Sequence, residues 1–216
     1  IIILFGILFS SCEKDSNTKN NIFKYNEYSN ISSLDPAFSS TLRNIWPVNQ
    51  IFNGLVQLDK NLEIKGDIAS SWTISEDKRI YTFKIRQDVY FHKSELFGKD
   101  LTRKVNAKDF EYSFNRLKDN KVASPGYWVF NNVKGFKAIN DTIFQIELKK
   151  EFDPFLGILS MKYCSVVPYE IIAILGDEFS KKPIGTGPFK FKKWDENVKL
   201  VLSKNKNYFE YDSLGQ

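Results

Sequence analysis

The residues GDIASSWTISEDKRIYTFKIRQDVYFH, at positions 66–92, decide the fold. In their second half, Tyr81, Phe83 and Ile85 alternate with polar residues, which is the two-residue period of a strand with one buried face. The polar run 75–78 just before them favours a turn. We therefore expect a β unit here, with the other elements of the chain packed around it.

The composition is that of a globular protein. The chain has 216 residues, of which 42% are hydrophobic and 15% aromatic, enough for one sizeable core or two small ones. The 31 basic and 26 acidic residues are interspersed, without a dense block of lysine or arginine, so we expect no nucleic-acid partner. Cys164 has no cysteine partner in the chain after Cys12, and its apolar neighbours predict a buried, unreactive thiol.

The N-terminal residues have the pattern of a bacterial lipoprotein. Residues 1–9, IIILFGILF, are apolar throughout but too few to span a bilayer, which takes roughly 20. They are typical of the hydrophobic part of a secretory signal, and Phe-Ser-Ser-Cys, ending at Cys12, is similar to a lipobox. We interpret 1–11 as a partial signal peptide, Cys12 as the lipidation site and 12–21 as a polar tether to the membrane. A buried first helix or strand is the alternative interpretation.

Hydrophobic spacing predicts helices and a strand on either side of the central unit. Residues 23–28 predict a short strand. Apolar residues at intervals of three and four predict a helix over 45–58 that ends near the Asn-Gly pair. The same spacing over 106–117 predicts an amphipathic helix, with Asn106 as its N-cap.

Two hairpins are expected in the second half of the chain. A turn signal divides 136–148 into two strands, and 189–202 has the same pattern. Two glycines and two prolines in 183–188 require an unusual backbone path. The Gly-Thr-Gly sequence within this segment opens a strand rather than a helix, so we interpret it as a backbone turn and not as a phosphate loop.

The sequence contains no pattern typical of catalysis or metal binding. His92 is the only histidine, and a metal site needs several converging ligands, so we expect a structural or surface role for it. No Ser-His-Asp arrangement and no distinct pair of carboxylates is visible. We therefore expect a protein that is not an enzyme and has no cofactor. A membrane-anchored hydrolase and an adhesive or sensory surface lipoprotein are the alternatives.

Several motifs follow one another along the chain. They are Ala-x-x-Trp at 69–72, Tyr-Thr-Phe-x-Ile-Arg at 81–86, Val-Tyr-Phe-His at 89–92, the Ala-x-Asp-Phe helix from 107, and Pro-Ile-Gly-Thr-Gly-Pro-Phe at 183–189. Together they resemble the signature of the family 5 extracellular solute-binding proteins, the oligopeptide and dipeptide receptors of ABC importers. The resemblance covers nearly all of 22–216.

The resemblance implies an α/β fold of the type II periplasmic binding protein class. It implies that 22–52 and 177–216 form an incomplete lobe I, and that 53–176 form an accessory α/β domain inserted into it. The lobe that clamps the ligand in this family is expected to lie further on, outside these 216 residues.

The resemblance also implies a function, which is extracytoplasmic capture of oligo- or dipeptides for an ABC permease complex by a lipid-anchored monomer. In the family, residues shortly after Leu-Asp-Pro line the pocket, and here they are Ser40, Thr41 and Leu42. An aromatic residue beside the Ala-Ser-Pro loop lies near the ligand, and here it is Tyr127. Ordinary surface loops are the alternative for these four residues. A nickel complex or an oligosaccharide is the alternative ligand.

Overall fold

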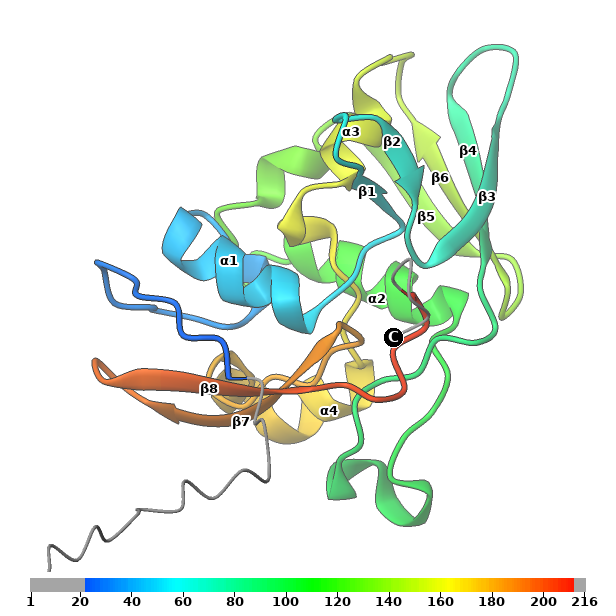
Figure 1. Cartoon of the computed structure of the whole chain (residues 1–216). Coiled ribbons are helices and arrows are strands. Elements are labelled where there is room, and N and C mark those ends of the chain that lie inside the picture. The colour runs from blue at the N-terminus through cyan, green and yellow to red at the C-terminus, as the bar shows by residue number, and fades with distance from the viewer. Residues whose placement is uncertain (1–21, 212–216) are drawn as a thin grey trace, which may run out of the picture.

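The computed structural model describes residues 22–211 (Figure 1). The predicted signal residues 1–11, the lipidation site Cys12 and the tether 12–21 lie outside this range. The α-helices are α1 (Leu42–Ile51), α2 (Ala107–Lys118), α3 (Phe155–Leu159) and α4 (Tyr169–Leu175). Short 3-10 segments are η1 (Pro36–Phe38), η2 (Glu95–Asp100), η3 (Tyr127–Phe130), η4 (Lys162–Cys164) and η5 (Gly176–Ser180). The strands are β1 (Val56–Leu58), β2 (Ile64–Gly66), β3 (Ala69–Ile74), β4 (Ile80–Ile85), β5 (Val133–Ala138), β6 (Ile143–Leu148), β7 (Phe189–Asp195) and β8 (Lys199–Lys204).

The predicted central β unit is confirmed. Strand β4 lies inside an antiparallel sheet of the order β3-β4-β6-β5, with β3 on one side of it and β6 on the other (Figure 1). Tyr81, Phe83 and Ile85 are buried, whereas Lys84 between them is exposed. The hairpin predicted over 136–148 is β5–β6 in the same sheet. The mixed α/β architecture expected from the sequence is therefore present.

Helix α2 covers the β5–β6 side of this sheet. Its start is fixed by a capping box, because the Asn106 side chain accepts from the amide of Asp109 and the Asp109 carboxylate accepts from the amide of Asn106. Phe114 is fully buried and packs against Phe130, with ring centroids 4.8 Å apart, and edge-on against Phe136 at 5.4 Å. The amphipathic helix predicted over 106–117 is confirmed, and it joins the sheet to an aromatic core.

The helix predicted in 45–58 with its end near the Asn-Gly pair is confirmed as α1, which starts earlier, at Leu42, and stops at Ile51, while 56–58 form β1. The Asp67 carboxylate accepts hydrogen bonds from the Asn53 side chain at 2.9 Å and from the amide of Gly54 at 3.0 Å. These bonds hold the chain extended where the helix would have continued. The apolar spacing continues past Ile51 because Leu55 and Val56 are buried as well, so spacing alone does not mark the boundary.

The strand predicted over 23–28 is absent, and this segment has no regular structure. Phe23 is 89% exposed and Tyr28 is 97% exposed. A strand needs a neighbour to pair its amide and carbonyl groups, and no strand of residues 22–211 pairs with this segment. Its apolar side chains are therefore uncovered within the part of the chain that the structure describes.

The Gly-Thr-Gly segment is a tight backbone turn against the end of α1, as expected. A Cβ at Gly185 would lie 2.1 Å from the carbonyl oxygen of Ile51, and the amide of Gly187 donates to that oxygen at 2.8 Å. His92 packs beneath the turn, with Nε2 2.9 Å from the carbonyl oxygen of Gly187 and the amide of Gly185 3.4 Å from Nδ1. The turn leads into the predicted β7–β8 hairpin, which packs on α1.

Burial lowers the pKa of His92 to about 4, and the positive charge of Lys190 also lowers it, while the hydrogen bond with Gly187 opposes the shift. Only the neutral ring can accept the amide hydrogen of Gly185 while donating to Gly187. Since the folded-state pKa lies below the ordinary value of 6.5, neutral His92 stabilises the fold fully above pH 6.5. That contribution is lost as the pH falls from 6.5 towards 4.

We predict that replacing His92 with Gln removes this part of the pH dependence of stability. The difference in unfolding free energy between wild type and His92→Gln should shrink by up to about 3 kcal/mol between pH 7.5 and 4. Urea unfolding at several pH values measures it. Asp67, whose pKa burial raises to about 6, titrates in the same window with the opposite sign, but it is present in both proteins and cancels in the difference. A difference that is constant with pH would contradict the prediction.

Candidate ligand-binding site

The loop that carries Ser40, Thr41 and Leu42 is anchored from below by buried polar groups. The Asp35 carboxylate caps η1 by accepting from the amide of Ala37 at 2.9 Å. Thr41 is the N-cap of α1, and Leu42 is its first residue. All three predicted side chains are exposed, and Leu42 is 67% exposed. The loop therefore presents two hydroxyl groups and an apolar side chain from a fixed backbone.

The loop that carries Tyr127 is fastened directly to the first one. The hydroxyl of Ser124 donates to the carbonyl oxygen of Ala37 at 2.5 Å and accepts from the amide of Gly126 at 3.0 Å. Tyr127 opens η3 and is 61% exposed. The structure thus brings the loops of all four predicted residues together. We call Ser40, Thr41, Leu42 and Tyr127 the two-loop surface.

Tyr163 links the two loops from behind. Its ring lies against Gly126, where a Cβ would come within 2.4 Å of Cδ1. Burial raises the pKa of the Tyr163 hydroxyl, and a hydrogen bond with the Ser40 side chain opposes part of that rise. The position after Pro125 must therefore be glycine, because the Tyr163 ring occupies the space of a side chain. Nothing in the sequence marks Tyr163, which lies in an apolar run and belongs to no motif.

A buried ion pair ties the first loop to α2. The Arg116 guanidinium donates to both oxygens of Asp35, at 2.9 and 2.5 Å, and the two side chains are only 12% and 3% exposed. This bidentate geometry fixes both partners. Asp35 therefore holds the loop at two points, the N-cap of η1 and the end of α2.

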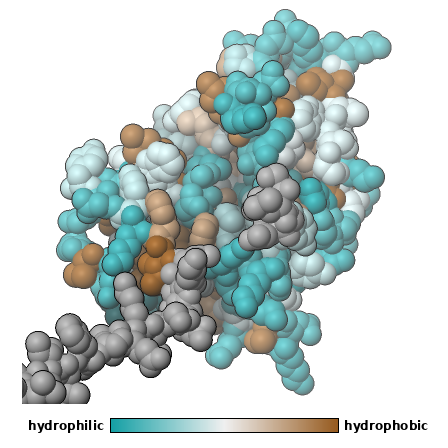
Figure 2. All heavy atoms as spheres, viewed as in Figure 1, coloured by the Kyte–Doolittle hydropathy of each residue, from teal (hydrophilic) through white to brown (hydrophobic). Residues whose placement is uncertain are grey.

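The two-loop surface is uncharged and open to solvent. Further exposed aromatic side chains come from the same segments, Trp46 of α1 at 51% and Trp128 of η3 at 44%. Figure 2 shows that hydrophobic residues form separate small groups among hydrophilic side chains on the face in view. Such a surface can offer hydrogen bonds from hydroxyl groups and apolar contact to an uncharged part of a ligand.

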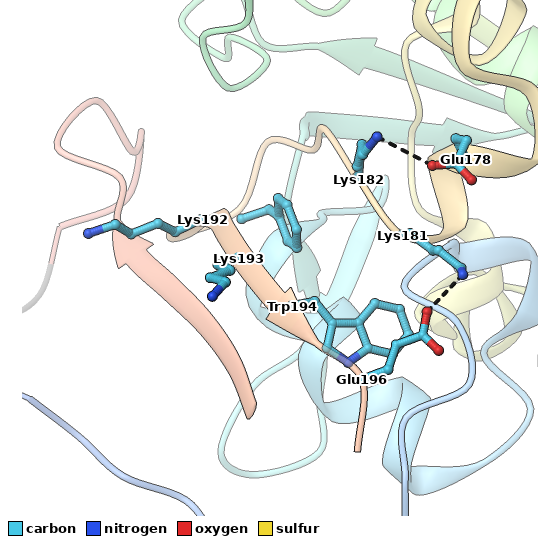
Figure 3. A pocket seen from close by; sticks show the side chains of 8 residues that line it. Glu178, Lys181, Lys182, Lys192, Lys193, Trp194 and Glu196 are labelled. Carbon is cyan, nitrogen blue, oxygen red and sulfur yellow. Dashed lines mark ion pairs between the residues drawn. The ribbon is translucent and has the colours of Figure 1, made fainter. Parts of the chain in front are cut away.

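Neither of two hollows on the described surface includes the two-loop residues. Both lie along β7 and the segments beside it, and Figure 3 shows one of them. Residues 22–211 contain no cluster of His, Cys, Asp and Glu suited to a metal ion. None of the helices within that range is long and apolar enough to cross a bilayer. The predicted buried state of Cys164 is confirmed, and burial raises the pKa of its thiol.

Comparison with known proteins shows the class to which this fold belongs. The profile of the bacterial extracellular solute-binding proteins, family 5 Middle, matches residues 63–214. The chain is a member of this family, and the resemblance inferred from the motifs is confirmed.

Individual relatives bind different ligands. The glutathione-binding protein GsiB of Escherichia coli K12 is 26% identical over 182 residues, which are 84% of this chain and 34% of GsiB. The chain thus spans about a third of the length of these curated relatives. The periplasmic binding protein DppA of Helicobacter pylori, solved with the peptide STSA, is 34% identical with a TM-score of 0.75, over 83% of this chain and 38% of DppA. NikZ of Campylobacter jejuni, solved with Ni(L-His), is 30% identical with a TM-score of 0.72, over 83% of this chain and 34% of NikZ.

We predict that Gly126→Ala destabilises the two-loop surface, because the new methyl group overlaps the Tyr163 ring. The expected loss is about 1–3 kcal/mol of unfolding free energy, measured by denaturant unfolding. Gly157→Ala is the matched control, since nothing lies within 4 Å of its Cβ position and it sits in α3. That control should be neutral or slightly stabilising. Equal effects of the two substitutions would contradict the prediction.

We also predict that Asp35→Asn costs about 3–5 kcal/mol of stability, since it leaves the buried Arg116 charge without its partner. Asp77→Asn is the control, because Asp77 and its partner Arg79 are half-exposed, at 48% and 50%. Its expected cost is much smaller, because an exposed ion pair contributes little to stability. Thermal and urea unfolding of both variants measure the contrast, and similar costs would show that the buried pair is not an anchor.

Proposed function

We propose that this chain forms one wall of a peptide site in an extracytoplasmic solute-binding lipoprotein of an ABC importer. The observation that supports this most directly is the Ser124–Ala37 hydrogen bond, which joins the loop of the exposed Ser40, Thr41 and Leu42 to the loop of the exposed Tyr127. Hydroxyl groups and an aromatic ring suit a peptide, whose backbone needs hydrogen bonds and whose side chains need apolar contact. Each such hydrogen bond contributes only about 0.5–1.5 kcal/mol, so a second wall must add others.

The family and its relatives support the same class of function. The matched profile describes extracellular solute-binding proteins, and DppA, at 34% identity, was solved with a bound peptide. In our proposal the ligand bridges two lobes and shifts a hinge equilibrium towards the closed state. The partners are a peptide and an ABC permease complex, and the protein acts as a monomer held to the membrane by lipid at Cys12.

We further propose that 22–52 and 177–216 belong to lobe I and that 53–176 form an accessory domain. In support, the central sheet and α2 lie entirely within 53–176, while the β7–β8 hairpin packs on α1. The two loops of the two-loop surface then belong to two different domains, since Ser40 lies before the proposed boundary between 52 and 53 and Tyr127 lies after it. Their fixed contact through Ser124 would make the wall rigid.

A second candidate ligand is a metal complex or another small solute. NikZ is 30% identical and was solved with Ni(L-His), and GsiB is named for glutathione binding. The exposed, uncharged two-loop surface is compatible with part of such ligands as well.

The test is calorimetric titration of the protein from the complete reading frame with the peptide STSA, with glutathione and with Ni(L-His). We expect a peptide to bind. Tyr127→Ala should raise the dissociation constant of that peptide about tenfold, as for an aromatic side chain at the centre of a contact. Tyr90→Ala is the control, since Tyr90 is 40% exposed but lies outside the two-loop surface. Tight binding of Ni(L-His) alone would favour the second candidate. Peptide binding that Tyr127→Ala leaves unchanged would remove Tyr127 from the site.

A further inference from the structure

Six lysines from separate parts of the chain gather around the β7–β8 hairpin. They line two adjoining hollows of about 340 and 560 Å³, which share Lys182, Phe191 and Lys192. Figure 3 shows the smaller hollow, with Lys192 and Lys193 extending from β7 and Lys181 and Lys182 from the segment before it. We call the set Lys93, Lys181, Lys182, Lys190, Lys192 and Lys193 the lysine surface.

The lysine surface is only partly neutralised. Lys181 pairs with Glu196 at 2.7 Å, Lys182 with Glu178 at 3.3 Å and Lys193 with Asp195 at 2.9 Å. The remaining three lysines form no ion pair within residues 22–211, and no acidic side chain lines the larger hollow. They are Lys93, Lys190 and Lys192.

The chain as a whole is also basic, with a net charge of +5. The positive charge of these lysines also acts inside the protein, because the charge of Lys190 contributes to the lowered pKa of His92. A surface on which several lysines are not offset by acidic side chains attracts anionic partners over a distance set by the ionic strength.

Aromatic and apolar side chains lie between the lysines. Phe191 and Trp194 are half-buried and line the smaller hollow, and Leu96, Leu175 and Ile184 line the larger one. Lysine stems lying along apolar surface, with ammonium groups directed to water, suit the boundary between headgroups and hydrocarbon. Tryptophan is favoured at the same depth of a bilayer.

The arrangement suits an extended anionic surface better than a single small anion. Five of the six lysines are exposed rather than pointing together into an enclosed space, so several negative charges at different positions are needed to engage them. We propose that the lysine surface binds the headgroups of anionic phospholipids and lays this face of the protein on the membrane. The two hollows share no residue with the two-loop surface.

The test is sedimentation of the 216-residue chain with vesicles of phosphatidylcholine alone or with 30% phosphatidylglycerol. The apolar residues 1–9 can bind either vesicle, so the readout is the ratio of partition coefficients, anionic over neutral. We expect this ratio to exceed ten at low salt and to fall towards one at 0.5 M NaCl, because the attraction is screened.

The decisive variant is Lys190→Glu with Lys192→Glu, which should lower the ratio on the order of tenfold or more. Lys190→Gln with Lys192→Gln should give a smaller loss in the same direction and guards against misfolding of the first variant. The matched control is Lys137→Glu with Lys150→Glu, two exposed lysines in and after the β5–β6 hairpin, and it should keep most of the wild-type ratio.

Either of two results would overturn the proposal, a wild-type ratio near one or a ratio that falls equally in the control and in the Lys190 and Lys192 variants. If the wild-type ratio is near one and the protein instead binds polyglutamate, with that binding lost in the Lys190 and Lys192 variants, the lysine surface belongs to an acidic protein partner.

Discussion

The close approach of the Gly185–Gly187 backbone to the end of α1 is the constraint on which the arrangement depends. A side chain at Gly185 would overlap the carbonyl oxygen of Ile51, and the amide of Gly187 donates to that same oxygen. His92 completes the contact from a position 95 residues before Gly187 in the sequence. Three distant parts of the chain therefore meet within hydrogen-bonding distance, and each needs the other two to satisfy its buried polar groups.

The two-loop surface follows from buried polar contacts of this kind. Asp35 and Arg116 hold the loop of Ser40 to α2, and the hydroxyl of Ser124 holds the loop of Tyr127 to the first loop. In both cases the anchoring group is buried and paired, while the side chains of the two-loop surface are exposed. A rigid scaffold with its recognition residues on short loops is the usual arrangement of a binding protein.

The lysine surface shows how misleading an even distribution of charge along a sequence can be. No segment of the chain is a dense basic block, yet folding places Lys93 beside residues of β7. The His92 contact with the Gly-Thr-Gly turn causes this, since it fixes the 92–96 segment against the approach to the hairpin. Separate lysines thereby become neighbours with few acidic side chains between them.

The sequence by itself determined the local elements with strong periodicity and the family. The alternation around Phe83, the spacing around Phe114 and the β5–β6 turn each reflect one buried face, which a period of two or 3.6 residues records directly. The motifs identified the family and placed Ser40 and Tyr127 as candidates. Only the tertiary structure decided where α1 ends, why residue 126 is glycine, that Tyr163 joins the two loops, and which lysines lie together. These depend on contacts between residues far apart in the chain, such as Asp67 with Gly54 or Tyr163 with Gly126, and no local pattern of side chains encodes such a contact.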